Sequence, residues 1–101
     1  MEYGIICPHL DNDGNSLVKQ LANFEDLLLE HCGGFTAHDV RGAWRGDDGE
    51  IYRDVSTLYT INTSQDYAEH LAMLFLQDAR QEAVYVRLPG GKVEILRDVQ
   101  G

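Results

Sequence analysis

With 101 residues, of which 44% are hydrophobic and 25% charged, the chain has the composition of a single globular domain, residues 1–101, and not of a disordered protein. Seventeen acidic residues against eight basic ones give a formal net charge of −9. This charge argues against direct binding of nucleic acid or of anionic membranes, because both need clustered Lys and Arg.

The cysteine content and the N-terminal residues indicate the compartment. Cys7 and Cys32 do not form a C-x-x-C motif, and two cysteines are too few for a disulfide-framed small domain. The first ten residues have no basic segment followed by a long apolar run, and no window resembles a membrane span. We therefore expect a cytoplasmic protein.

The first third of the chain predicts a strand followed by a helix. Residues 2–7 form a short run with β-branched and aromatic residues, and Pro8 ends it. A polar turn follows, in which Asn15 or Ser16 is placed to accept a hydrogen bond from the first free amides of a helix. Apolar residues then recur with helical spacing at Leu17, Leu21, Phe24 and Leu28, widened by Val18, Ala22 and Leu29, until Gly33 ends the helix.

Residues 33–61 predict a long hairpin around which the rest of the chain is organised. The Gly-Asp-Asp-Gly sequence at 46–49 is a strong turn signal, because Asp-Gly tolerates positive φ angles. Alternation before the turn places Trp44 in the core and Arg41 and Arg45 outside. The strand after the turn has apolar residues on both faces, with Tyr52 and Leu58 opposite the rest, which favours contact with a partner.

The last third predicts a helix and a second hairpin. Thr63 or Ser64 caps the helix and Asp66 lies in its first turn. The apolar positions of this helix are Tyr67, Ala68, Leu71, Ala72, Leu74, Phe75 and Ala79. Residues 83–88 and 93–96 then form strands joined at Pro89-Gly90-Gly91, and we expect the tail from 98 to 101 to fray.

This order is that of an α+β, ferredoxin-like β-α-β-β-α-β sandwich with a C-terminal hairpin and two helices on one face of an antiparallel sheet. Because the helices can cover only one face, the other face must be polar or covered by another chain. The apolar residues on both faces of the third strand favour a homodimer through the sheet.

Several motifs resemble known sites but lack required residues. Residues 9–14 resemble a calcium loop, yet alignment on Gly14 puts His9 first and Gln20 in the position that needs Glu. Cys7 and His9 could share a strand face, but nothing nearby would activate the thiol. The remaining His and Cys residues show no zinc spacing. We predict no catalytic residues, no metal and no cofactor.

Two charged clusters are candidate binding sites. Asp47, Asp48 and Glu50 at the hairpin turn, with Glu25, Asp26 and Glu30 of the first helix, could imitate a row of phosphates and bind a basic nucleic-acid-binding host protein. Arg41, Arg45 and Arg53 share one face of the hairpin, where they could bind an anion or be solvated. Arg41 and Arg45 with Tyr52 and Tyr59 form the alternative ligand site.

Three strings in the hairpin, Gly33-Gly34-Phe35-Thr36, Gly42-Ala43-Trp44-Arg45 and Gly49-Glu50-Ile51-Tyr52, resemble a recurrent pattern in small, uncharacterised bacterial and phage proteins of ferredoxin-like fold. This resemblance implies the fold and a phage setting, and it supplies no catalytic residue. In size and charge the chain is also similar to anti-CRISPR proteins, small acidic inhibitors of host defence nucleases.

We therefore predict a non-enzymatic acidic protein of the phage inhibitor type, which occupies a basic nucleic-acid-binding site on a host protein. The alternative is a dimeric small-molecule sensor or small enzyme, with its ligand between the sheet face and the central hairpin. A third reading, a structural subunit, would require a large apolar interface.

Overall fold

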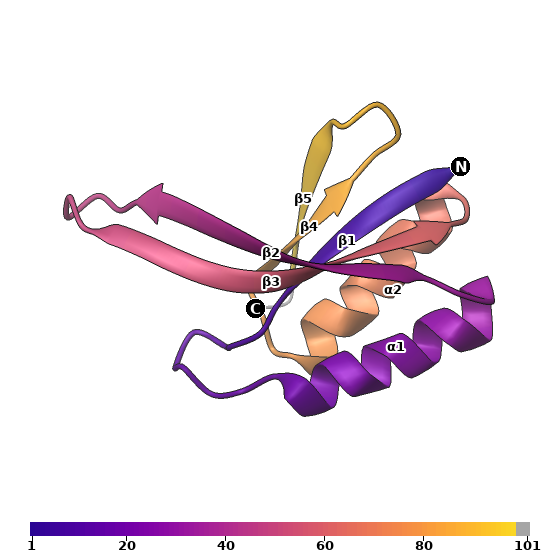
Figure 1. Cartoon of the computed structure of the whole chain (residues 1–101), viewed down its shortest axis with the longest axis horizontal. Coiled ribbons are helices and arrows are strands. Elements are labelled where there is room, and N and C mark those ends of the chain that lie inside the picture. Colours follow the sequence, from indigo (N-terminus) through magenta and orange to yellow (C-terminus); the bar gives the residue numbers. More distant parts are fainter. Residues whose placement is uncertain (99–101) are drawn as a thin grey trace.

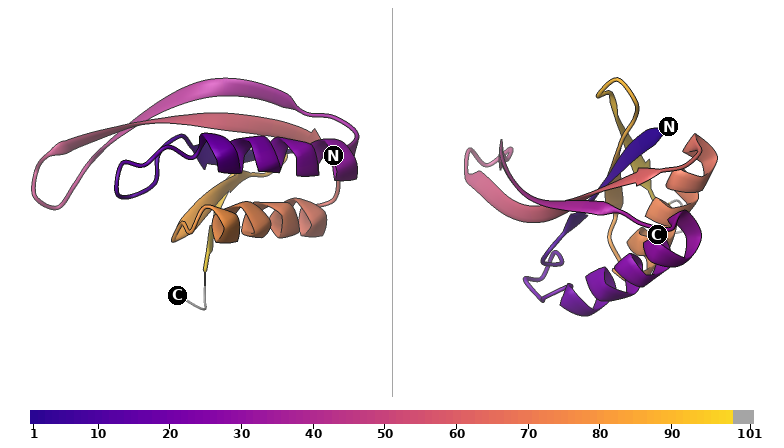
Figure 2. Two further views of the ribbon diagram at one scale, coloured as in Figure 1. Left: turned by 90° about the horizontal axis from the view of Figure 1, so that it is seen from below. Right: turned by 45° about the vertical axis from the view of Figure 1, so that its right-hand side comes forward.

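The computed structural model describes residues 1–98, and its strands form one antiparallel sheet with both helices on one face (Figures 1 and 2). The strand order in the sheet is β2-β3-β1-β4-β5. This arrangement confirms the predicted ferredoxin-like sandwich with its terminal hairpin. The elements are β1 (Glu2–Pro8), α1 (Val18–Cys32), β2 (Thr36–Arg45), β3 (Ile51–Asn62), α2 (Gln65–Asp78), β4 (Ala83–Arg87) and β5 (Val93–Arg97).

Strand β1 lies in the middle of the sheet and carries the alternation that its sequence predicts. Tyr3, Ile5 and Cys7 are buried on the side of the helices. Gly4 and Ile6 face the other side, where they lie opposite residues of β3 and β4. Because it has a neighbour on each edge, β1 connects the two hairpins of the sheet.

The loop before α1 is closed by local hydrogen bonds. The side chain of Asp11 accepts from the backbone amides of Asp13 (2.9 Å) and Asn15 (2.8 Å). The Ser16 hydroxyl accepts from the Val18 amide at 3.2 Å, as predicted for this residue, although Leu17 occupies the cap position itself. Gly33 ends the helix in the left-handed conformation with a φ of 78°, which confirms its predicted role.

Helix α1 buries a narrower stripe than its sequence predicts. Phe24 and Leu28 are buried, with Leu21 and Leu27 packed beside them. Val18 is 70% exposed and Leu29 is 53% exposed, so the predicted widening of the stripe by Val18, Ala22 and Leu29 is wrong. The helix contacts the sheet and α2 along one side only, and periodicity does not reveal how wide that contact is.

Aromatic rings join the helices to the sheet. The ring of Phe24 lies 5.4 Å from that of Tyr59 on β3 in an edge-on arrangement, and 5.3 Å from that of Phe75 on α2. Rings at such separations contribute beyond the area they bury. The two helices and the sheet therefore meet at Phe24.

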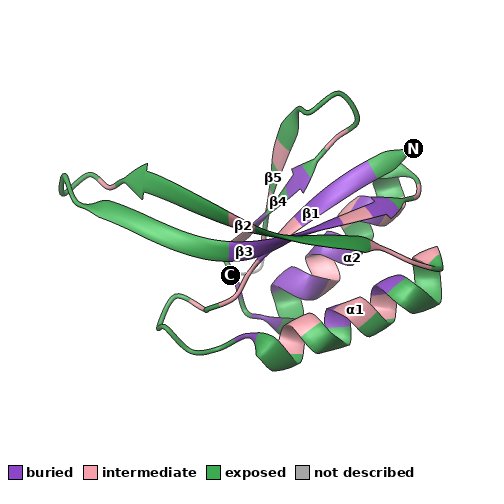
Figure 3. Cartoon of the chain, viewed as in Figure 1, coloured by how far each residue is buried: buried purple, intermediate pink, exposed green. Residues whose placement is uncertain are grey.

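The β2–β3 hairpin extends well beyond the helices (Figures 1 and 3). We call its projecting part, residues 41–55, the arm. Every residue of the arm is exposed except Gly46, which is half-buried. Trp44 is 56% exposed, so the prediction that it lies in the core is wrong. Alternation sets the face on which a side chain lies, but no helix covers this end of the hairpin.

The C-terminal third follows the prediction closely. Ser64 caps α2 by accepting from the Tyr67 amide at 3.3 Å. Gly90 and Gly91 have φ angles of 93° and 91° in the turn between β4 and β5. The Asp98 amide donates to the Glu82 carbonyl at 3.2 Å, and the rest of the expected frayed tail lies outside the described residues.

We predict that Phe24→Ala lowers the free energy of unfolding by about 3–5 kcal/mol, because it leaves a cavity where α1, α2 and β3 meet. Urea denaturation followed by circular dichroism measures this change. Val18→Ala, on the exposed side of the same helix, should change stability by less than about 0.5 kcal/mol. Equal effects of the two substitutions would show that Phe24 does not organise the core.

Candidate functional site

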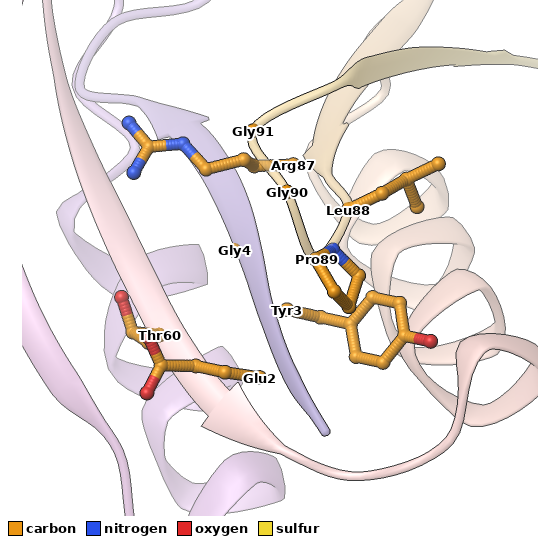
Figure 4. Close-up of a pocket in the computed structure, with 9 residues that line it drawn as sticks. All are labelled: Glu2, Tyr3, Gly4, Thr60, Arg87, Leu88, Pro89, Gly90 and Gly91. Carbon is orange, nitrogen blue, oxygen red and sulfur yellow. The ribbon is translucent and has the colours of Figure 1, made fainter.

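A hollow of about 370 Å³ lies where the ends of β3, β1 and β4 run side by side (Figure 4). Thr60 on β3 is opposite Gly4 on β1, and Gly4 is opposite Arg87 on β4. A Cβ on Gly4 would lie 2.8 Å from Leu58 Cδ1 and 3.3 Å from Arg87 Cβ. The missing side chain of Gly4 therefore gives the hollow its floor.

The residues that line this hollow include one acidic and one basic side chain, Glu2 and Arg87. Figure 4 shows Glu2, Thr60 and Arg87 on one side of β1, and Tyr3 with Pro89 on the other. No salt bridge within residues 1–98 uses Arg87 or Glu2. A guanidinium without a protein partner can bind a carboxylate or phosphate through two parallel hydrogen bonds, and a carboxylate without a partner can bind a cation. The hollow therefore suits a polar ligand with charged groups of both signs.

A second feature is a pair of carboxyl groups between α2 and β5. The side chain of Glu94 forms a hydrogen bond with that of Glu69, which raises the pKa of Glu94 above its ordinary value, with smaller contributions from desolvation and from the charge of Glu69. Gln65 Nε2 donates to Glu69 Oε2 at 3.3 Å. Glu94 lies on the helix side of the sheet, since it is opposite the buried Val86. The pair is therefore separate from the hollow.

The predicted acidic surface is divided between two parts of the molecule. Asp47, Asp48 and Glu50 lie at the tip of the arm, whereas Glu25, Asp26 and Glu30 lie on α1, away from that tip (Figures 1 and 2). They do not form one continuous row, and their binding of a partner stays a prediction.

Two of these acids have local structural partners. Asp48 accepts from the Tyr52 hydroxyl at 2.6 Å and from the Glu50 amide at 2.9 Å. The bond from Tyr52 is the main reason that the pKa of Asp48 is lowered. Glu25 accepts from the Tyr59 hydroxyl at 2.7 Å. Both carboxylates therefore stabilise the fold locally.

The alternative ligand residues are not brought together either. Arg41, Arg45 and Arg53 do share one face of the arm, but the register places Tyr52 on the opposite face, beside Trp44. Tyr59 is 1% exposed in the core, where burial and then the bond to Glu25 raise its pKa strongly. Whether Arg41, Arg45, Tyr52 or Tyr59 binds a ligand stays a prediction, but the four do not line one site.

Cys7 and His9 have no arrangement for nucleophilic catalysis. Cys7 is buried, and burial raises the pKa of its thiol. His9 Nε2 lies 2.7 Å from Thr57 Oγ1 and 3.9 Å from Asp39 Oδ1. Among residues 1–98, no group of three or more His, Cys, Asp or Glu side chains could hold a metal ion.

None of the helices in that range is long and apolar enough to span a membrane.

Sequence reasoning missed the hollow and the carboxyl pair. Glu2, Gly4, Thr60 and Arg87 come from three strands, and only the register of β1 with its two neighbours brings them together. The one local signal is that Arg87 shortly precedes the Pro89-Gly90-Gly91 turn, where backbone can approach a ligand closely.

No protein-family model matches the chain, and no curated protein matches its sequence significantly. Two solved structures are similar to it in fold. A phage SAM lyase in complex with S-methyl-5'-thioadenosine has a TM-score of 0.69 and 15% sequence identity, with 96% of this chain and 88% of that chain covered. A phage SAM lyase in the apo state has the same score and identity, with 97% and 89% covered.

These comparisons contradict the prediction of a non-enzymatic acidic inhibitor, because both of the similar structures are of an enzyme, a phage SAM lyase. They favour the alternative, a small enzyme. The expected phage setting agrees with the source of both structures, whereas nothing supports the likeness to anti-CRISPR proteins. The error came from net charge, which reports on solubility as much as on partners.

We predict that Glu94→Gln stabilises the protein at neutral pH. In the folded chain Glu94 keeps its proton to a higher pH than in the unfolded chain, so the stability due to that proton is present in acid and lost as the pH rises. The pair is largely solvated, so the gain should stay below about 1 kcal/mol. Urea denaturation at pH 7 should show it, and at pH 3.5 it should vanish.

The matched control is Glu82→Gln, an exposed acid before the same hairpin, which should shift neither curve. A Glu94→Gln variant that is equally stabilised at both pH values would mean that the two carboxyl groups do not share a proton.

Proposed function

We propose that this protein is a small enzyme that acts on S-adenosylmethionine as a lyase. The observation that carries the proposal is the fold, which is similar over 96% of the chain to a phage SAM lyase in complex with S-methyl-5'-thioadenosine. Fold alone does not determine chemistry, so the residues of a candidate site must also suit the substrate.

The hollow over Gly4 has groups that complement S-adenosylmethionine. Its methionyl end carries a carboxylate and an ammonium group, and its sulfur carries a positive charge. Arg87 can bind the carboxylate through two hydrogen bonds, and Glu2 can bind the ammonium group or lie near the sulfonium. The Thr60 hydroxyl can donate or accept. In this arrangement the polar end of the substrate lies over Gly4.

The chemistry of a lyase fixes what the site must do. The bond between the sulfonium sulfur and the γ-carbon of the methionyl group breaks, and its electron pair stays on sulfur, which gives neutral S-methyl-5'-thioadenosine. No water is added, so the step balances when an oxygen of the substrate's own carboxylate attacks the γ-carbon and closes a ring, which needs no proton acceptor. Formation of a double bond would instead need a base to take the proton on the β-carbon. Positioning that carboxylate is therefore the role we assign to Arg87.

Two of the sequence predictions, the cytoplasmic location and the phage setting, are compatible with this proposal. An enzyme that consumes a diffusible cellular metabolite acts in the cytoplasm, and two free cysteines suit a reducing compartment. We also place the protein in a phage setting, on the source of the two similar structures. The Glu69–Glu94 pair receives no role in the reaction, because it lies on the helix side of the sheet.

We expect the purified protein to convert S-adenosylmethionine to S-methyl-5'-thioadenosine, which chromatography with ultraviolet detection measures against a protein-free control. Arg87→Met should lower kcat/KM roughly 10- to 100-fold, which corresponds to one lost charge-assisted bond pair. Arg97→Met, an exposed arginine on β5, should leave the rate unchanged.

Failure to release S-methyl-5'-thioadenosine, together with no rise in melting temperature when that compound is added, would overturn the proposal. If Arg87→Met formed S-methyl-5'-thioadenosine with the same kcat/KM as the wild type, the lyase activity would stand, but the hollow over Gly4 would not be its site.

A further inference from the structure

The arm separates its side chains by charge between its two faces. The register of β2 with β3 puts Arg41, Arg45 and Arg53 on the side of the sheet that carries the helices. The stacked rings of Trp44 and Tyr52 lie on the opposite side. Because the arm extends beyond the helices, its basic face is uncovered (Figures 1 and 3). Three of the eight basic residues of this acidic chain therefore share one short, exposed strand surface.

These three arginines have no acidic partner in the protein. None of them forms a salt bridge within residues 1–98. The Arg45 side chain donates to the uncharged carbonyl oxygen of Gly49 at 3.0 Å. Asp39, at the inner end of the same row, lies beside His9 instead, with 3.9 Å between Oδ1 and Nε2. The guanidinium groups can therefore bind carboxylates from outside, each through two parallel hydrogen bonds.

The spacing of the arginines follows the pleat of the hairpin. Arg41 and Arg45 are four residues apart along β2, which is about 14 Å in an extended strand. Arg53 lies opposite Ala43, halfway between them. The methyl side chain of Ala43 leaves room for the long Arg53 side chain to reach across it. Projected along β2, the three charges are roughly 7 Å apart, which is the spacing of alternate residues in an extended peptide.

Strand β2 is an edge of the sheet with unpaired backbone groups. The Gly46 amide donates to the Glu50 carbonyl at 2.9 Å, and the register is constant along the hairpin, so the even-numbered residues of β2 bond to β3. The amides and carbonyls of Arg41, Ala43 and Arg45 therefore point away from β3. No strand of residues 1–98 lies on that side. An edge of this kind accepts an added strand from a partner.

We propose that the outer edge of the arm binds an extended acidic peptide segment of a partner protein as an added strand. The backbone of the segment pairs with Arg41, Ala43 and Arg45. Acidic side chains at three alternate positions of the segment meet Arg41, Arg53 and Arg45 in turn. Specificity comes from the match in spacing between the carboxylates and the arginines, and orientation comes from the backbone ladder. This inference does not depend on the proposed reaction.

Two other occupants fit this surface less well. Two copies of the chain joined along β2, with Ala43 beside Ala43, would place Arg41 of each against Arg45 of the other, and like charges in that position repel. A single nucleic-acid strand also carries regular negative charges. Its bases need aromatic rings to stack on, and the rings of the arm lie on the opposite face.

A fluorescein-labelled peptide of about ten residues that alternates glutamate with threonine is the probe. Fluorescence anisotropy measures its binding at about 0.1 M salt, which screens the net charge of the chain beyond about 10 Å. Arg53→Glu should weaken binding at least about tenfold, because it replaces a charge-assisted pair by a repulsion. Arg97→Glu, at an exposed arginine on β5, should leave binding unchanged. Circular dichroism should show both variants folded, because both side chains are exposed.

The decisive control changes the peptide and not the protein. In an antiparallel added strand the amides of the glutamates point toward β2, so N-methylation of the glutamates should weaken binding at least about tenfold without changing any charge. N-methylation of the threonines, whose amides point away, should leave binding largely intact.

Three results would overturn the proposal. The first is equal binding of the two N-methylated peptides, which would mean that the arginines attract acids without strand pairing. The second is tighter binding of an oligothymidylate strand of equal charge, which would assign the surface to nucleic acid. The third is binding to the wild type no stronger than to Arg53→Glu, as expected if another copy of the chain already covers the edge.

Discussion

The contact between Tyr59 and helix α1 holds the layers of this protein together. The Tyr59 ring packs edge-on against Phe24 and against Phe35, each at 5.4 Å, while its hydroxyl donates to Glu25 at 2.7 Å. An aromatic ring in the core with a satisfied polar tip contributes both packing and orientation. Tyr59 therefore fixes the position of β3 relative to α1.

The long hairpin becomes an arm where the helices no longer cover β3. Residues 56–59 of β3 are buried, whereas residues 51–55 are exposed. The helices end their coverage of the sheet there, and the hairpin continues past them with nothing packed on either face (Figure 3). A strand segment with exposed rings on an otherwise polar protein is typical of a surface that meets another chain.

The proposed substrate site depends on the uncovered end of the sheet. At Gly4, β1 presents no side chain to the uncovered face of the sheet. Arg87 and Thr60 flank this position on the neighbouring strands. The site therefore consists of a gap in a sheet face and not of a loop motif. The surplus of carboxylates, on which the prediction of an inhibitor depended, is distributed over the arm tip and α1, and parts of it have structural partners in Tyr52 and Tyr59.

The sequence by itself determined the order of the elements, the end of α1, the start of α2 and the turns, because caps, glycines and periodicity act over a few residues. Gly33, Ser64 and Gly90-Gly91 take the roles that their chemistry predicts. Only the tertiary structure decided which faces are covered and which residues meet. The exposure of Trp44, the approach of Glu69 to Glu94 and the row Thr60, Gly4 and Arg87 follow from strand register and helix placement. These features depend on contacts between segments far apart in the sequence, and the periodicity and capping residues of one segment carry no information about them.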